Sequence, residues 1–266
     1  MGVKTNIKTK IKAIIGTKNV SRLKIVKSHV NRIKNHSNWS KLSIDCSDWE
    51  LERIIKINNK HVFFGYYDIQ QLNKKQDKAL IHVLDRKAVA GKSPICIKWV
   101  DLKNGNIHDI TTSMAWSWQQ GCRLRWHPLL EDTVILNNCV DGKYVTEVWS
   151  IKNNKSTLLN RYPVAFYDID SNFQYGISVN FSRLQRLRPG YGYTNLQDNT
   201  MNEFVPVNDG IWRYDFETGK NKLLYSLKDL VDLTPEAKGK WNYVNHVSFA
   251  PDGKQFMFFH IWTEGP

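Results

Sequence analysis

Three arginines in one short stretch are the residues of this sequence best suited to chemistry on an anionic ligand. The stretch RLQRLRPGYGY contains Arg183, Arg186 and Arg188, followed by Tyr191 and Tyr193. A guanidinium binds a carboxylate through two parallel hydrogen bonds, and a tyrosine ring stacks on the apolar face of a sugar. These residues predict a surface that binds a glycan or a carboxylate. The alternative is a solvated loop face.

Two neighbouring amides form a second candidate for ligand contact. Gln119 and Gln120 follow two tryptophans in WSWQQGC, and amides of this kind can bind sugar hydroxyls. Trp116 and Trp118 are equally well explained as packing residues. Asp68, in FFGYYD, is a further candidate, with a hydrogen bond inside the fold as its alternative. P-loop, GxGxxG, GxSxG and HExxH motifs are absent from the sequence, so neither a nucleotide enzyme nor a serine hydrolase is indicated.

The positive charge of the chain is confined to its first sixth. The formal net charge is +13 over 266 residues, and residues 1–44 hold 11 Lys and Arg without a single acid. The rest is close to neutral, which argues against nucleic acid as a partner of the body. The sequence contains no apolar run of about 18 residues that would indicate a membrane span. The cysteines, which lack CxxC spacing and are interpreted as reduced thiols, are Cys46, Cys96, Cys122 and Cys139.

Apolar residues within 1–44 recur at helical spacing, with lysines on the other faces. One stripe consists of Ile7, Ile11, Ile14 and Ile15. A basic amphipathic arm of this kind can dock on an anionic membrane or on a partner protein. The alternatives are an arm packed on the body and a disordered tail. No secretory signal is recognisable, so we expect a cytoplasmic protein, with membrane association through residues 1–44 as the hypothesis to test.

From Asp45 onward the sequence repeats two kinds of hairpin. Outer hairpins are predicted in VDLKNGNIHDI (100–110), WSIKNNKSTLL (149–159) and YDFETGKNKLL (214–224), with a type I′ turn at Asn104–Gly105. Inner hairpins precede them, the clearest turn being Pro251–Asp252–Gly253. Four antiparallel strands in a unit of about 45–50 residues are typical of a β-propeller blade. The fold class is therefore all-β, a β-propeller over residues 45–266, with an irregular β-sandwich as the alternative.

Three complete blades are expected, at about 65–115, 117–163 and 164–230, the last enlarged by an insertion at 183–209. A fourth begins near Trp241, and residues 52–65 either complete it by ring closure or belong to an earlier blade. Because half a blade leaves an open sheet edge, we expect a truncated propeller.

Several stretches resemble a known family. The PDGK hairpin is similar to the TolB-type, WD40-like repeat. A larger set resembles a bacterial propeller family related to oligogalacturonate lyases, over about residues 60–266. These stretches are WSWQQGCRLRW (116–126), NFSRLQRLRPGYGY (180–193), NDGIWRYD (208–215) and NHVSFAPDGKQFMFFHIW (245–262). The resemblance implies a propeller fold and carbohydrate chemistry.

The resemblance also implies a metal site. In oligogalacturonate lyases the first His of a pattern close to GHxxFxP binds a divalent metal such as manganese, and this position falls on His246. A structural hydrogen bond between blades is its alternative role. The implied reaction is β-elimination, in which a metal neutralises the uronate carboxylate and an arginine removes the neighbouring proton. Arg183, Arg186 and Arg188 are candidates for that base by residue type, since none aligns with it.

Two classes of function follow. The first is a metal-assisted lyase of uronate-containing oligosaccharides. The second is a noncatalytic propeller that binds a glycan or a protein, tethered through residues 1–44 and linked to surface-polysaccharide production.

Overall fold

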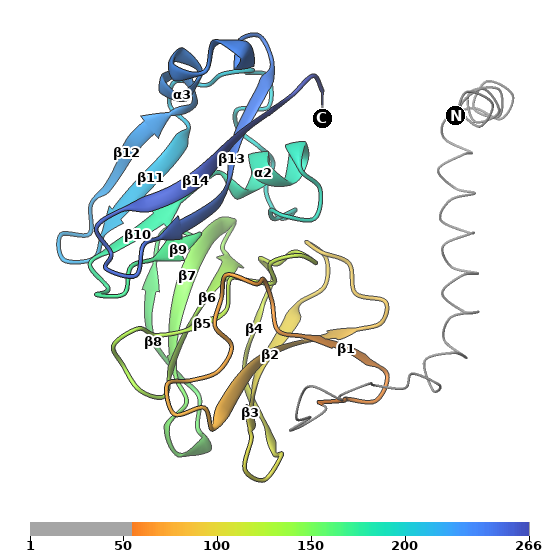
Figure 1. Cartoon of the computed structure of the whole chain (residues 1–266). Helices are drawn as coiled ribbons and strands as arrows, with labels where there is room; N and C mark the ends of the chain where they lie inside the picture. The colour runs from red at the N-terminus through yellow and green to blue at the C-terminus, as the bar shows by residue number, and fades with distance from the viewer. Residues whose placement is uncertain (1–54, 266) are drawn as a thin grey trace, which may run out of the picture. The chain divides into compact units, whose positions relative to one another are not determined.

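A computed structural model describes residues 55–265, and their strands form four antiparallel sheets that follow one another in chain order (Figure 1). The three larger sheets are up-and-down meanders. The first comprises β1 (Lys60–Phe63), β2 (Lys78–Asp85), β3 (Ile95–Asp101) and β4 (Ile107–Ser113). The second comprises β5 (Arg125–Trp126), β6 (Thr133–Val140), β7 (Lys143–Ser150) and β8 (Thr157–Tyr162). The third comprises β9 (Asp168–Ile169), β10 (Tyr175–Ser178), β11 (Gly210–Asp215) and β12 (Asn221–Ser226). The last pairs β13 (Trp241–Phe249) with β14 (Phe256–Thr263).

Short helical segments lie in the connections between strands. They are η2 (Lys152–Asn154), α2 (Phe181–Leu187), α3 (Leu227–Leu233) and η3 (Pro235–Ala237). The side chain of Asn180 caps α2 by accepting a hydrogen bond from the Arg183 amide, and Ser226 with Asp229 forms a capping box on α3. Within residues 55–265, none of the helices has the length and apolar character that crossing a membrane requires.

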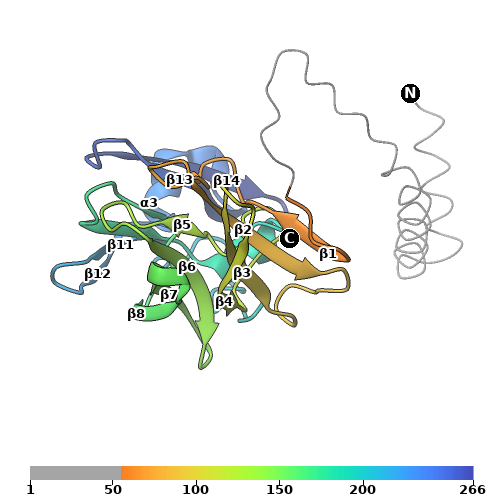
Figure 2. The same cartoon turned by 90° about the horizontal axis from the view of Figure 1, so that it is seen from below.

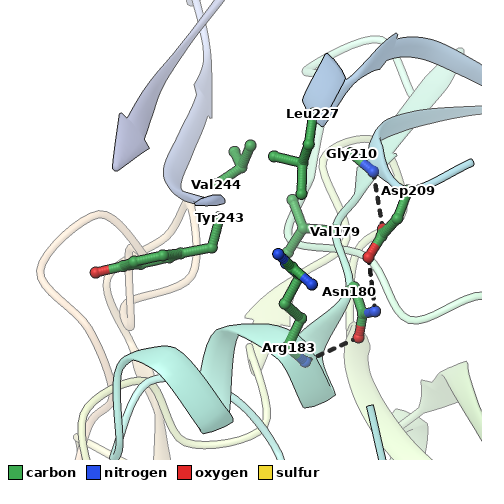
Figure 3. A pocket seen from close by; sticks show the side chains of 8 residues that line it. All are labelled: Val179, Asn180, Arg183, Asp209, Gly210, Leu227, Tyr243 and Val244. Atoms are coloured by element: carbon green, nitrogen blue, oxygen red, sulfur yellow. Dashed lines mark hydrogen bonds between the residues drawn. The ribbon is translucent and has the colours of Figure 1, made fainter. Parts of the chain in front are cut away.

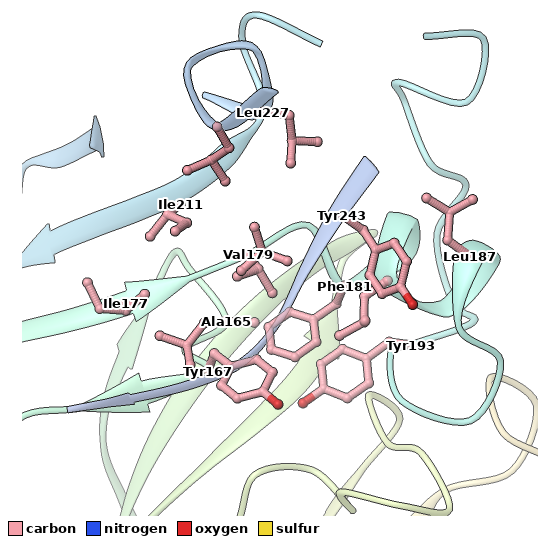
Figure 4. Packing of buried hydrophobic residues seen from close by; sticks show 14 of the residues in the cluster. Ala165, Tyr167, Ile177, Val179, Phe181, Leu187, Tyr193, Ile211, Leu227 and Tyr243 are labelled. Atoms are coloured by element: carbon pink, nitrogen blue, oxygen red, sulfur yellow. The ribbon is translucent and has the colours of Figure 1, made fainter. Parts of the chain in front are cut away.

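Burial decreases from the second strand of a sheet to its outermost strand. Six successive residues of β2 are buried, whereas five of the six residues of β8 are exposed. A strand buried on both faces indicates that its sheet is covered on both sides by neighbours. Accordingly, three of the four apolar clusters among the described residues join consecutive sheets, and the fourth lies within the first sheet. The largest (Figure 4) joins residues of the third sheet, such as Ile177, to Phe181 and Leu184 of α2 and to Val247 of β13.

Three of the inner hairpins have turns of the same backbone conformation. In each, the last of the four turn residues has a left-handed φ: Gln76 (55°), Phe173 (54°) and Gly253 (71°). The turn predicted at Pro251–Asp252–Gly253 is therefore present. The outer turn at Asn104–Gly105 differs from the prediction, because only Gly105 has a positive φ (82°), and a type I′ turn needs two such residues. The Asp101 amide instead donates to the Asn106 carbonyl, giving a longer loop.

The prediction of an all-β, propeller-like fold is confirmed by these sheets. Residues Lys60–Phe63 pair with β2, so this strand belongs to the first sheet and does not complete the last one. The number of blades stays a prediction, and the basic arm at 1–44, together with Cys46, lies outside the described residues. The other three cysteines, at positions 96, 122 and 139, are free thiols.

One hydrogen-bonded network joins all four sheets at their inner ends. The Arg123 guanidinium, with its side chain 1% exposed, donates to both carboxylate oxygens of Asp68, at 3.1 and 2.8 Å. Its Nε donates to the Tyr167 carbonyl at 2.8 Å, and the Tyr167 hydroxyl donates to the Asn245 amide oxygen at 2.9 Å. Each of the four residues comes from a different sheet or the segment leading into it. Figure 2 shows these sheets following one another from β1 to β14.

A second set of side-chain contacts joins the first strands of the second, third and fourth sheets. Arg125 of β5 forms an ion pair with Asp168 of β9, and Asp168 accepts a hydrogen bond from the Phe249 amide of β13 at 2.7 Å. Because neighbouring sheets share no backbone ladder, these side chains hold the inner ends of the sheets together.

We expect Asp68→Ala to lower the free energy of unfolding by about 3–5 kcal/mol, because Arg123 would keep a buried charge without a partner. The matched control is Asp85→Ala, which removes the partner of Lys60 from an ion pair in which Asp85 is 74% exposed. That variant should cost about 0–1 kcal/mol. Urea unfolding measures both, and equal effects would contradict the role given to the buried pair.

A second prediction concerns Gly121, which has φ +58° and lies against the buried His82 ring. A Cβ at this position would lie 2.4 Å from the imidazole. Gly121→Ala should therefore destabilise the fold clearly more than Gly142→Ala, where φ is +70° but no atom lies within 4 Å. The control isolates the backbone strain, of about 1 kcal/mol. Thermal unfolding of the two variants gives the comparison, and similar losses would show that the contact with His82 is unimportant.

Candidate functional site

Aromatic rings from four chain segments meet where the long connections of the sheets lie. We call this set, Tyr66, Tyr67, Tyr191, His246 and Phe259, the aromatic face. The Tyr66 ring lies 5.7 Å from His246 and 6.2 Å from Tyr191, and Phe259 lies 5.0 Å from His246. The Tyr67 hydroxyl is 3.4 Å from His246 Nδ1. Tyr67 is 80% exposed, so the face opens to solvent.

Arg188 brings the positive charge to this face. It follows α2, is exposed, and its guanidinium lies 5.0 Å from the centre of the Tyr191 ring. Hydrogen bonding to the Tyr191 hydroxyl raises the pKa of Arg188 above its ordinary value. In the part of the chain that the structure describes, no carboxylate forms an ion pair with Arg188, whereas Arg186 of the same helix pairs with Asp198 at 2.9 Å.

The backbone of β13 turns His246 toward the face. The pairing of β13 with β14 shifts register between Asn245 and Ser248, and His246 has a left-handed φ of 51°. A bulge of this kind re-aims one side chain out of the regular alternation. Arg123 lies three residues before the end of β5, as His246 lies three residues before the end of β13, and it also has a positive φ, 55°. Strained positions of this kind cost about 1–3 kcal/mol each and cluster at functional sites.

The electrostatics of the face favour a neutral imidazole. Partial burial lowers the pKa of His246, and the positive charges of Arg188 and Arg123 lower it further, against the opposite effect of Asp68. Burial, followed by the neighbouring Tyr191, raises the pKa of the Tyr66 phenol. At neutral pH the face therefore presents neutral hydrogen-bonding groups and one cation.

Some predicted site residues belong to the face and others lie beneath it. Arg188, Tyr191 and His246 meet there. The exposed Gln119 adjoins them through its backbone N–H, which donates to the Gly190 carbonyl at 3.2 Å. Gln120 is buried and donates to the Tyr167 hydroxyl at 2.7 Å. The remaining two are also engaged within the protein. The Asp68 carboxylate binds Arg123, and Tyr193, 1% exposed, accepts a hydrogen bond from Asn137 at 2.9 Å.

The other two arginines hold the insertion in place. Arg183 is 1% exposed and donates to the carbonyls of Asn242 (2.7 Å), Thr200 (3.0 Å), Glu203 (3.0 Å) and Phe204 (3.0 Å). Figure 3 shows its side chain beside a cavity of about 10 Å³, which is about the size of one water molecule. Arg186 pairs with Asp198 and lies over the Trp241 ring. With all these acceptors supplied by the protein, Arg183 and Arg186 act as anchors of residues 183–209.

The surroundings of His246 do not fit a divalent metal. Its ring neighbours are phenols and a phenyl group, and two guanidinium groups act on it electrostatically. Among residues 55–265 there is no group of three or more His, Cys, Asp or Glu side chains placed to hold a metal ion. Zinc and similar sites need three or four such donors, so one imidazole is insufficient. His260 lies elsewhere, with its ring nitrogens 3.0 Å from Thr234 Oγ1 and 2.8 Å from Asn242 Oδ1.

Sequence reasoning did not identify several residues of this region. Tyr66 and Tyr67 were visible only as part of FFGYYD, and nothing in their spacing distinguishes them from core aromatics. Arg123, Tyr167 and Asn245 carry the network under the face, yet Arg123 and Tyr167 are 44 residues apart along the chain, and Tyr167 and Asn245 are 78 apart. One sequence feature could have indicated them, because Asn245 directly precedes His246, which the sequence analysis did select.

Comparison with known proteins adds little beyond the architecture. No family model matches the chain, and no curated protein matches it. Among solved structures it is similar to TolB from Acinetobacter baumannii, with 14% identity and a TM-score of 0.40, covering 75% of this chain and 37% of that one. It is also similar to the tricorn protease, with 10% identity, a TM-score of 0.35 and coverage of 77% and 20%. The fold is propeller-like.

That statement rests on the topology of the sheets, because similarity at these scores carries no argument about this chain. The aligned region spans well under half the length of either protein. The relation to oligogalacturonate lyases is not shown by these comparisons.

A pH dependence follows from His82, which is completely buried with its Nδ1 3.0 Å from the Phe64 carbonyl. Burial lowers the pKa of His82 to about 4. An unfolded histidine titrates near 6.5, so between these values the unfolded chain binds a proton that the native protein does not. The stability that a neutral His82 provides is thus present above pH 6.5 and lost as the pH falls toward 4, by about 3 kcal/mol.

Urea unfolding between pH 7 and pH 4 should show this loss, and His82→Gln should have a shallower dependence. If that variant does not fold, the pKa of His82 can be measured in the natural protein by NMR titration of its ring. A pKa near the ordinary value of histidine would contradict the prediction.

Proposed function

We propose that this protein binds an acidic carbohydrate on the aromatic face, next to Arg188. The observation that carries the proposal is the convergence of partly exposed rings from separate segments around a guanidinium that forms no ion pair within residues 55–265. Solvent-exposed rings are costly to keep together unless a ligand or partner covers them.

The chemistry of the face matches a sugar acid better than a purely apolar ligand. The tyrosine rings offer apolar surfaces for the C–H face of a sugar, and their hydroxyls can bind its hydroxyl groups. His246, neutral at pH 7, can both donate and accept hydrogen bonds. Arg188 supplies the planar pair of donors that a carboxylate accepts.

Binding is favoured over catalysis. The lyase function implied by the sequence resemblance requires a divalent metal, and the donors around His246 within residues 55–265 do not form a metal site. One observation keeps the lyase as a second candidate: His246 and Arg188 act on each other electrostatically and lie on the same face.

Incubation with oligogalacturonides and manganese, with and without a chelator, distinguishes the lyase from a binding protein, because only a lyase yields an unsaturated product that absorbs in the ultraviolet. A chelator-sensitive product would favour the lyase.

The central test is Arg188→Gln, measured by calorimetric binding of an oligogalacturonide and of a neutral oligosaccharide of equal length. Loss of a charge-assisted hydrogen bond, worth about 1.5–3 kcal/mol, should weaken binding of the acidic ligand about tenfold to a hundredfold. Binding of the neutral ligand should change little.

The matched control is Arg213→Gln on β11. The Arg213 guanidinium also lies over a tyrosine ring, that of Tyr175 at 4.6 Å, but neither residue is part of the aromatic face. This variant should bind like the natural protein. Absence of acidic-glycan binding by the natural protein, or equal effects of the two substitutions, would refute the proposal.

A further inference from the structure

We infer that Trp118 forms a second stacking subsite, so that the ligand is an oligosaccharide chain rather than a single sugar. The inference rests on the proposed function, because it extends the same surface. It starts from the exposure of Trp118, which is 44%, while every other tryptophan among residues 55–265 is buried or half-buried.

The indole of Trp118 is held in place although it is exposed. It meets the Trp116 ring at 5.2 Å and an interplanar angle of 84°, and the His61 ring at 5.7 Å and 87°. Trp116 is completely buried and is itself fixed by a hydrogen bond from its Nε1 to the Ser93 carbonyl, at 2.7 Å. A ring that is already immobilised loses little conformational entropy when a sugar stacks on it.

The Trp118 subsite is connected to the aromatic face in two ways. The backbone N–H of Gln119 donates to the Gly190 carbonyl at 3.2 Å, and these residues directly adjoin Trp118 and Tyr191. From standard backbone dimensions, the Cα atoms of Trp118 and Tyr191 are then within roughly 9 Å of each other. The segment from β1 to Tyr67 also touches both places: Phe63 lies 6.3 Å from Trp118, and Tyr66 lies 6.2 Å from Tyr191.

The side chain between the two stacking places is polar. Gln119 is exposed and carries both a donor and an acceptor, as a sugar hydroxyl requires. An alternation of rings with an amide, phenol hydroxyls and a guanidinium differs from the contiguous apolar centre of a protein interface. We therefore assign the surface from Trp118 through Gln119 to Tyr191 to neighbouring units of one sugar chain.

The test measures how affinity depends on the length of the ligand. The probes are galacturonate and its di-, tetra- and hexasaccharides, titrated into the full chain by calorimetry. For the natural protein, affinity should rise with length. Trp118→Ala should weaken binding of the hexasaccharide about tenfold, the size expected for one lost ring contact of about 1.4 kcal/mol, and leave the monosaccharide unaffected.

Two further variants control this comparison. Tyr225→Ala removes a ring of equal exposure, 45%, from β12 outside this surface, and should bind every probe normally. Trp118→Phe keeps a ring, and should recover part of the hexasaccharide affinity. It also serves if Trp118→Ala fails to fold, as judged by circular dichroism.

The outcomes separate this inference from the proposed function. If the natural protein binds none of the probes, the proposed function fails and the inference with it. If it binds them with an affinity independent of length, or if Trp118→Ala binds the hexasaccharide normally, only the second subsite is refuted. Equal weakening of the monosaccharide and the hexasaccharide would place Trp118 in the first subsite and also refute the inference.

Discussion

The buried ion pair between Arg123 and Asp68 is the interaction on which the inner ends of the sheets depend. A guanidinium with an exposure of 1% is tolerated only because its donors are taken by the Asp68 carboxylate and the Tyr167 carbonyl. Burial alone would lower the pKa of Arg123, but Asp68, Tyr167 and Asp168 together outweigh it and raise the pKa. The pair keeps its charge and, through Tyr167 and Asn245, connects four sheets whose strands do not pair with one another.

The aromatic face is built directly on this network. Tyr67 precedes Asp68, Gln119 precedes Gln120, and His246 follows Asn245, so each of these three network residues has a neighbour in the chain that lies at or beside the face. Tyr67 and Asp68 lie in a turn, as do Gln119 and Gln120, and His246 has a left-handed φ at the bulge of β13, so the backbone is irregular at all three places. The same backbone segments can therefore place one polar side chain in the network and the next at or beside the face. The network fixes where the face residues stand relative to one another.

The insertion at 183–209 reaches the face through a second buried cation. Arg183 binds three carbonyl groups within the insertion and the Asn242 carbonyl of β13, and thereby fastens the insertion to that strand. Arg188, only five residues later, lies beyond the end of α2 and is exposed. Two arginines of one short motif thus lie in opposite environments: Arg183 is buried within the fold, and Arg188 is exposed beside the Tyr191 ring.

The sequence by itself determined the local structure. Alternating apolar residues and turn residues such as Pro251–Asp252–Gly253 predicted the hairpins and the all-β class, because strand pairing and turns depend on neighbours along the chain. It also marked the stretch that supplies Arg188 and Tyr191. Only the tertiary structure decided which candidates are exposed. The carbonyls that bury Arg183, and the Arg123 that engages Asp68 from 55 residues away, come from distant segments. Burial of a polar side chain depends on whether the fold brings it partners, and spacing along the chain does not contain that information.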